Sequence, residues 1–164
     1  MRPSGLAASV VIATANMSHA DTTELMFCAM ENSSKMVSVR LDGADVTYAY
    51  GNLNEMSDLV LTTPAADVDY QPWPGVGNTI WETITFYNGD YEYVVVMGAE
   101  RKDNPQKYGG ITVRKAGEEI AALDCIPSSV SFDFGNHLYD AKTQAGWCLD
   151  RGAKGGWTRC DQEL

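Results

Sequence analysis

The sequence predicts an all-β domain, an antiparallel meander of about seven or eight strands closed into a small barrel. Apolar and polar residues alternate with period two through residues 24–125, which is the pattern of half-buried strands. Turn signals that contain glycine interrupt this stretch at Asp42-Gly43, Asn88-Gly89 and Ala116-Gly117. A cysteine stands near each end of the stretch, where a disulfide would join the first strand to the last.

The candidate strands follow one another in short succession, so neighbours in sequence are expected to pair. They cover residues 37–41, 46–50, 59–61, 68–70, 80–86, 91–97, 111–113 and 120–123. Asn88-Gly89 is the strongest hairpin signal, because both residues tolerate the positive φ of a type I′ turn. An open sheet would expose two edges that invite aggregation, and joining the first and last strands into a barrel removes them.

Residues 1–20 have the features of a secretory signal peptide. Arg2 precedes the apolar stretch 5–15, and small residues at 18–20 predict cleavage before Asp21. The alternative is an apolar N-terminal strand. No second apolar stretch approaches the length of a spanning helix, so we expect a periplasmic or secreted protein without a membrane span, with the β-barrel domain at 21–125.

Four cysteines in an exported chain indicate two disulfides, for which three connectivities are possible. Cys148 and Cys160 lie close together in a Gly-rich segment, which favours a local pair and leaves Cys28 with Cys125. Zinc is the competing interpretation. The spacings contain no C-x-x-C unit, and His137 is the only histidine after residue 20, so no metal site is expected.

The pattern changes after Cys125, which predicts a C-terminal extension at 126–164. Residues 126–129 have the composition of a linker, and Asn136 could cap a short helix that ends before Gly146. The segment 147–160 holds two tryptophans inside the small disulfide loop. It is too short for a core of its own, so we expect it to pack on the barrel.

The net charge of −10 argues against nucleic acid as a partner and favours cationic partners. No catalytic residues are predicted, because a nucleophile needs a base and His137 at a helix start is better explained as a surface histidine. Asp67 and Asp69 could share one face of a strand, but such pairs are routine in acidic proteins and the calcium-loop pattern is absent. We therefore expect neither an enzyme nor a cofactor.

Two loops are candidates for binding. In 70–78, prolines flank Trp73 and would hold it as a rigid anchor, although the ring could instead plug the mouth of the barrel. The connection 99–110 gathers positive charge in an acidic chain, although it could be a solvated loop without a special role. The candidate binding residues are Tyr70, Trp73, Arg101, Lys102, Lys107 and Tyr108.

Phe27-Cys28, the stretch 37–51 and the closing residues 118–125 resemble the small periplasmic inhibitors of c-type lysozyme, a group with membrane-bound and periplasmic members. The resemblance implies an exported antiparallel barrel whose first and last strands are joined by a disulfide, and binding to a lysozyme. That group carries a Ser-Gly-x-x-Tyr loop, which residues 21–164 lack. Residues 107–110 (KYGG) stand at a suitable place but in a different order, so no inhibitor residue is transferred to them.

These observations lead to the expectation of an exported protein-binding module, with a cationic lysozyme-type peptidoglycan hydrolase as the candidate partner. Two alternatives remain open at the level of sequence. One is a structural or assembly factor of the envelope that acts through residues 126–164. The other is a carrier of a small ligand in a barrel cavity. The oligomeric state is not predicted.

Overall fold

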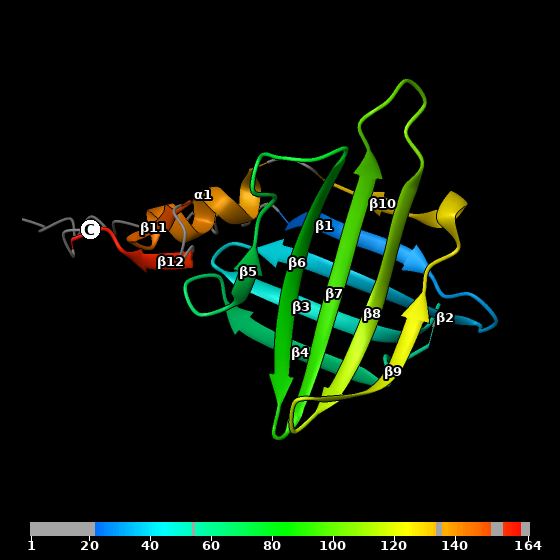
Figure 1. Ribbon diagram of the computed structural model, residues 1–164. Helices are drawn as coiled ribbons and strands as arrows, with labels where there is room; N and C mark the ends of the chain where they lie inside the picture. Colours follow the sequence, from blue (N-terminus) through cyan, green and yellow to red (C-terminus); the bar gives the residue numbers. More distant parts are fainter. Residues whose placement is uncertain (1–21, 54, 134–135, 152–155, 162–164) are drawn as a thin grey trace, which may run out of the picture.

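The computed structural model describes residues 22–53, 55–133, 136–151 and 156–161, so the predicted signal peptide at 1–20 lies outside the described residues. More than half of the described chain is β-strand, arranged as two five-stranded antiparallel sheets and a small hairpin (Figure 1). The strands are β1 (Thr22–Ala29), β2 (Lys35–Asp42), β3 (Asp45–Asn52), β4 (Leu59–Pro64), β5 (Asp69–Gln71), β6 (Thr79–Asn88), β7 (Tyr91–Glu100), β8 (Lys107–Lys115), β9 (Glu118–Asp124), β10 (Ser131–Phe132), β11 (Trp147–Asp150) and β12 (Gly156–Arg159). A 3-10 turn at Pro127–Ser129 and the helix α1 (His137–Gln144) complete the fold.

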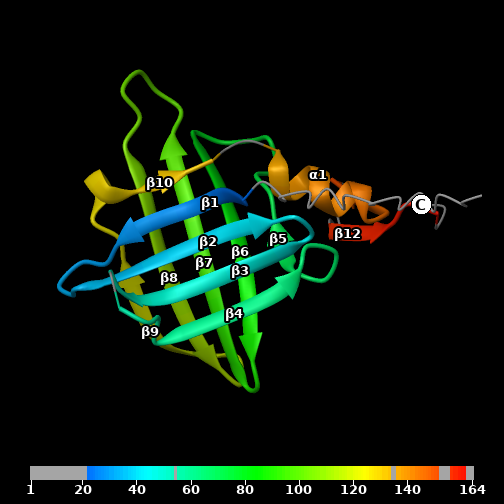
Figure 2. The ribbon, with the colours of Figure 1, turned by 180° about the vertical axis from the view of Figure 1, so that it is seen from behind.

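The first sheet has the order β10-β1-β2-β3-β4, and the second has the order β5-β6-β7-β8-β9. Apart from β10, which pairs with β1, the strands within each sheet pair in chain order, whereas the consecutive strands β4 and β5 lie in different sheets. This confirms the predicted all-β, antiparallel class. The two sheets face each other, and their strands cross steeply (Figures 1 and 2). The two-stranded sheet β11-β12 lies to one side with α1, next to β5.

The predicted barrel is wrong, because the two sheets do not join into one closed ladder. Between β4 and β5 the chain turns through residues 65–68, where Val68 N–H bonds the carbonyl of Pro64 at 2.9 Å. At the opposite corner, β9 meets the first sheet through the single bridge between Met30 and Cys125. The two sheets are therefore connected by a tight turn at one corner, and by this bridge and the Cys28–Cys125 disulfide at the other. Period-two alternation encodes none of these connections.

Both predicted disulfides are confirmed. Cys28 of β1 bonds Cys125, which directly follows β9 and lies 97 residues away. Cys148 bonds Cys160, 12 residues away. Constraining a loop as long as the first is worth about 4–5 kcal/mol in the chain-entropy model. Disulfides persist in oxidising compartments, so the pair fits a protein outside the cytoplasm.

Large side chains from both sheets fill the space between them. The Tyr48 ring on β3 lies 5.4 Å from the Phe86 ring on β6 and 5.8 Å from the Tyr93 ring on β7, measured between centroids. Tyr48 and Phe86 are fully buried. The interior of the sandwich is therefore occupied by aromatic rings, which leaves the surface as the place to look for a binding site.

The predicted hairpins occur at the expected positions, but the turn type predicted at Asn88-Gly89 is wrong. Asn88 pairs with Tyr91, so the central residues of the β6–β7 turn are Gly89 and Asp90. Of these only Gly89 has a positive φ, 60°, which is the pattern of a type II′ turn rather than the expected type I′. Both central residues have positive φ at Ala116-Gly117, where the type I′ pattern does occur.

The C-terminal extension contributes to the core. The predicted helix is confirmed as α1, with Asn136 at its N-cap and Gly146 just beyond its end at a φ of 87°. Leu138 on α1 is 3 % exposed and packs into the cluster between the sheets. No helix among the described residues is long and apolar enough to cross a membrane.

Candidate functional site

An open groove of about 840 Å³ lies between residues 66–74 and the C-terminal extension. We refer to it as the groove. One wall comes from β5 and the residues on either side of it, and the other wall comes from α1, β11 and β12. The lining residues are Ala66, Asp67, Val68, Asp69, Tyr70, Gln71, Pro72, Pro74, Lys142, Trp147, Leu149, Asp150, Arg151, Gly156 and Trp157.

Strand β5 is an edge strand, and the C-terminal extension covers that edge with side chains rather than with another strand. Trp157 Nε1–H donates to the carbonyl of Tyr70 at 2.7 Å. Arg151 donates to the carbonyl of Trp73 at 3.2 Å. These bonds fix the distance between the two walls of the groove.

Lys142 provides the third connection, from α1 to the turn that precedes β5. Its Nζ donates to the carbonyls of Ala65, Ala66 and Val68 at 3.3, 3.1 and 2.9 Å. The side chain is 3 % exposed, and burial lowers its pKa while the negative charges of Asp69 and Asp67 act in the opposite direction.

Aromatic rings surround this connection. The Trp157 ring lies 5.2 Å from the Tyr139 ring and 6.1 Å from the Tyr70 ring. The Nζ atom of Lys142 lies 5.3 Å from the Trp157 centroid and 5.5 Å from the Trp147 centroid, within the range of cation–π attraction. The groove therefore has an aromatic floor that already holds one cation.

Carboxylates stand at the rim of the groove. Asp67 and Asp69 are exposed, and Asp69 accepts a hydrogen bond from the Tyr87 hydroxyl at 2.9 Å. Lys142 uses its three N–H groups on main-chain carbonyls, so it donates none to these carboxylates. The rim near Asp67 and Asp69 thus keeps a negative potential toward solvent.

The two loops that the sequence indicated separately meet in the structure. The guanidinium of Arg101 lies 5.0 Å from the centroid of the Trp73 ring and also donates to the carbonyl of Gly77 at 3.2 Å. Trp73 Nε1–H donates to the carbonyl of Val76 at 2.9 Å, and Val76 itself is 70 % exposed. We call residues 72–78 and 100–106 together the loop end. Trp73 is half-buried within it rather than freely exposed.

The other candidate residues are distributed differently. Tyr70 is buried and forms part of the groove floor. Lys102 forms an ion pair with Glu100, and Lys107 lies over the Phe132 ring at 5.3 Å.

Tyr108 is 38 % exposed and packs across Gly98 on β7. A Cβ added at Gly98 would come within 2.3 Å of the Tyr108 ring. Tyr108 therefore has its ring position fixed by β7. Of the candidate residues, Tyr70 lines the groove, Trp73, Arg101 and Lys102 lie in the loop end, and Lys107 and Tyr108 lie on β8.

A polar cluster behind Tyr70 was not anticipated. Glu82 occupies an inward position on β6, two residues before the buried Ile84, and its carboxyl forms a hydrogen bond with the Tyr70 hydroxyl. Burial raises the pKa of Glu82 to about 7, against the opposing effect of that bond, and the charge of Asp133 raises it further. Asp133 in turn pairs with Nδ1 of His137. The sequence did contain a signal for this cluster, because the alternation along residues 80–86 assigns the carboxyl of Glu82 to the core face of the strand.

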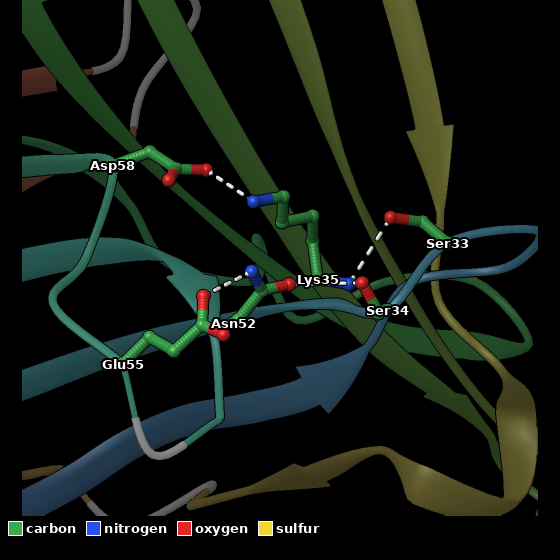
Figure 3. A network of polar contacts seen from close by, with 6 residues as sticks. All are labelled: Ser33, Ser34, Lys35, Asn52, Glu55 and Asp58. Carbon is green, nitrogen blue, oxygen red and sulfur yellow. Dashed lines mark hydrogen bonds and ion pairs between the residues drawn. The ribbon is translucent and has the colours of Figure 1, made fainter.

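A second polar network, on the first sheet, supports a loop rather than a site (Figure 3). Lys35 Nζ lies 2.7 Å from a carboxylate oxygen of Asp58. Ser34 donates to Asn52 at 2.8 Å, and Asn52 also contacts Glu55. These side chains are exposed or partly exposed, and such surface ion pairs contribute about 0–1 kcal/mol.

Across the described ranges, no three His, Cys, Asp or Glu side chains gather closely enough to hold a metal ion. Comparison with protein families, curated proteins and solved structures finds no match for this chain. The functional interpretation therefore depends on the groove and the loop end.

Proposed function

We propose that this chain is an exported, periplasmic or secreted, protein-binding module whose partner is cationic, with a lysozyme-type peptidoglycan hydrolase as the candidate class. The observation that carries the proposal is the groove, which combines aromatic walls with the exposed carboxylates of Asp67 and Asp69 and continues into the loop end. The N-terminal sequence and the two disulfides support export.

The loop end suits an interface because it is already ordered. Trp73 is held by its own hydrogen bond to Val76 and by Arg101, so it would lose little conformational freedom on binding. Buried aromatic anchors of this kind carry much of the energy of protein interfaces. The overall charge of −10 would accelerate encounter with a basic protein at low salt.

The test is capture of basic hydrolases from a lysozyme panel and from envelope extract by the oxidised protein, residues 21–164, at low and moderate salt. We expect capture of a lysozyme with loss of its lytic activity, and weaker capture as salt rises. Asp67→Asn with Asp69→Asn should lower affinity about tenfold at low salt, since two charge contacts of roughly 0.5–1 kcal/mol each are lost.

The matched control is Glu118→Gln with Glu119→Gln, which removes the same charge from β9 at the opposite edge of the second sheet. A control variant that weakens binding as much as the groove variant would assign the effect to net charge and reject the groove as the interface. Trp73→Ala should weaken binding at every salt concentration. Failure to capture any cationic protein would reject the proposal as a whole.

A small-ligand carrier is a second candidate, because the volume of about 840 Å³ falls in the range of known ligand pockets. The ligand would then sit in the groove, since Tyr48 and Phe86 fill the space between the sheets. A thermal-shift screen of small molecules tests this function, and stabilisation that Trp157→Ala abolishes would support it. Deleting 126–164 is unsuitable here, because it would remove one wall of the groove and Leu138 from the core.

A further inference from the structure

The most unusual group in the described residues is the buried ammonium of Lys142, the one charged side chain that is fully buried there. Burying a charge without compensation is very costly. An ammonium has three N–H donors, and here three carbonyl oxygens lie at 2.9 to 3.3 Å from Nζ. Every donor of the buried cation therefore has an acceptor.

The surroundings complete a cation site. The Trp157 and Trp147 rings contribute their electron-rich faces at 5.3 and 5.5 Å from Nζ, and Asp69 and Asp67 add negative potential from the rim. We infer that the turn at residues 65–68 is a receptor for a primary ammonium group, and that Lys142 fills this receptor from within the chain and thereby holds the C-terminal extension against β5.

The carbonyl half of the receptor lies in the turn between β4 and β5, which has hydrogen bonds of its own besides those to Lys142. Ala65 N–H bonds the carbonyl of Ala44 at 2.7 Å, and Val68 N–H bonds the carbonyl of Pro64 at 2.9 Å. Ala65 and Val68 are each 2 % exposed. The turn is thus anchored by its own bonds and by burial, so its carbonyls should keep their convergent arrangement when the lysine is absent.

The geometry also defines which cations fit. Three convergent acceptors match the compact ammonium group, whereas the planar guanidinium of arginine spreads its donors in a fixed fork. A quaternary ammonium could contact the rings but has no N–H to donate. Because Ala66, Val68 and Lys142 line the groove, a primary amine from solution, or a lysine side chain of another molecule, can reach the receptor once Lys142 leaves. This inference goes beyond the proposed function and requires no partner protein.

The test is chemical rescue of Lys142→Ala. n-Propylammonium supplies the three carbons and the nitrogen that alanine lacks. The readout is amide hydrogen exchange in α1, β11 and β12. We expect exchange there to be at least tenfold faster in the variant than in the wild type, and to return toward wild type with n-propylammonium. 1-Propanol and tetramethylammonium, which lack the charge and the N–H donors respectively, should not restore protection. Lys35→Ala, which removes a partly exposed lysine at the start of β2, is the matched control and should leave exchange in α1, β11 and β12 unchanged.

Wild-type protection in Lys142→Ala would overturn the inference, and so would equal rescue by all three additives or by none. A measurement on the intact protein covers the case in which the variant does not fold. The Nζ–H protons of one lysine should be resolved by NMR because three carbonyls protect them from solvent exchange. Absence of any such signal would also overturn the inference. Capture of a cationic protein is a separate readout, so failure of this receptor leaves the proposed function to its own test.

Discussion

Replacing Glu82 by Gln should remove a loss of folding stability that occurs as the pH rises. Glu82 lies on β6 against Tyr70, and burial raises the pKa of its carboxyl from 4.5 to about 7. The folded state therefore holds a proton that the unfolded chain has already released over this interval. Glutamine keeps a carbonyl oxygen that can accept from the Tyr70 hydroxyl, but it has no charge to bury.

The size and sign of the effect follow from that shift. One pKa unit corresponds to about 1.4 kcal/mol, so the rise from 4.5 to about 7 sets an upper limit of roughly 3 kcal/mol. Glu82 is only partly buried, so we expect about 2 kcal/mol after screening by solvent. The folded state binds more protons than the unfolded state, so the stability that Glu82 contributes is complete below pH 4.5 and is lost as the pH rises through about 7.

The assay is urea unfolding of the oxidised protein at pH 5 and pH 8. Because pH 5 lies just above the unfolded-state pKa of 4.5, Glu82→Gln should raise the free energy of unfolding by under about 1 kcal/mol at pH 5 and by about 2 kcal/mol at pH 8. Glu118→Gln, an exposed carboxyl on β9, serves as the control and should have little effect at either pH. If the difference between pH 5 and pH 8 is as large in Glu82→Gln as in the wild type, the argument from burial is refuted.

Three further outcomes can be checked by unfolding and hydrogen exchange. Gly98→Ala should destabilise by about 1–3 kcal/mol, because the new Cβ would meet the Tyr108 ring at 2.3 Å; an unchanged melting temperature would contradict this. Trp157→Phe should cost about 1 kcal/mol, because it loses the bond to β5, and should speed exchange in β12 first. Serine at Cys28 and Cys125 should lower the free energy of unfolding by about 4–5 kcal/mol, measured in urea.

Local signals carried most of what could be predicted of the fold. Alternation around Val37 and Val39, together with glycine at the turns, is a property of consecutive residues, so the hairpins followed from it. The short separation of Cys148 and Cys160 likewise indicated their pairing. The barrel failed because closure depends on how distant strand edges meet. The turn at 65–68 places β4 and β5 in different sheets. At the opposite corner the strand edges meet only at the isolated bridge between Met30 and Cys125.

The site was predicted in part for the same reason. Trp73 between its prolines marked one wall of the groove, because that wall is a single continuous segment. The other wall comes from residues more than 70 positions away, and nothing in the pattern around Lys142 or Trp157 indicates which carbonyls they bind. Glu82 is the residue that the sequence could have revealed, since a carboxyl at an inward strand position calls for an explanation.

The covering of β5 also bears on how this protein avoids self-association. An edge strand offers its carbonyls to any extended chain nearby, and natural proteins block such edges in several ways. Here Lys142, Trp157 and Arg151 occupy carbonyls along β5 and the residues flanking it. A chain cut by a protease between α1 and Cys148, outside the Cys148–Cys160 disulfide loop, would keep its two five-stranded sheets but lose Trp157 and Arg151. The carbonyls of Tyr70 and Trp73 would then be open to cross-strand pairing between molecules, so cleavage in this segment would convert a protected edge into a starting point for aggregation.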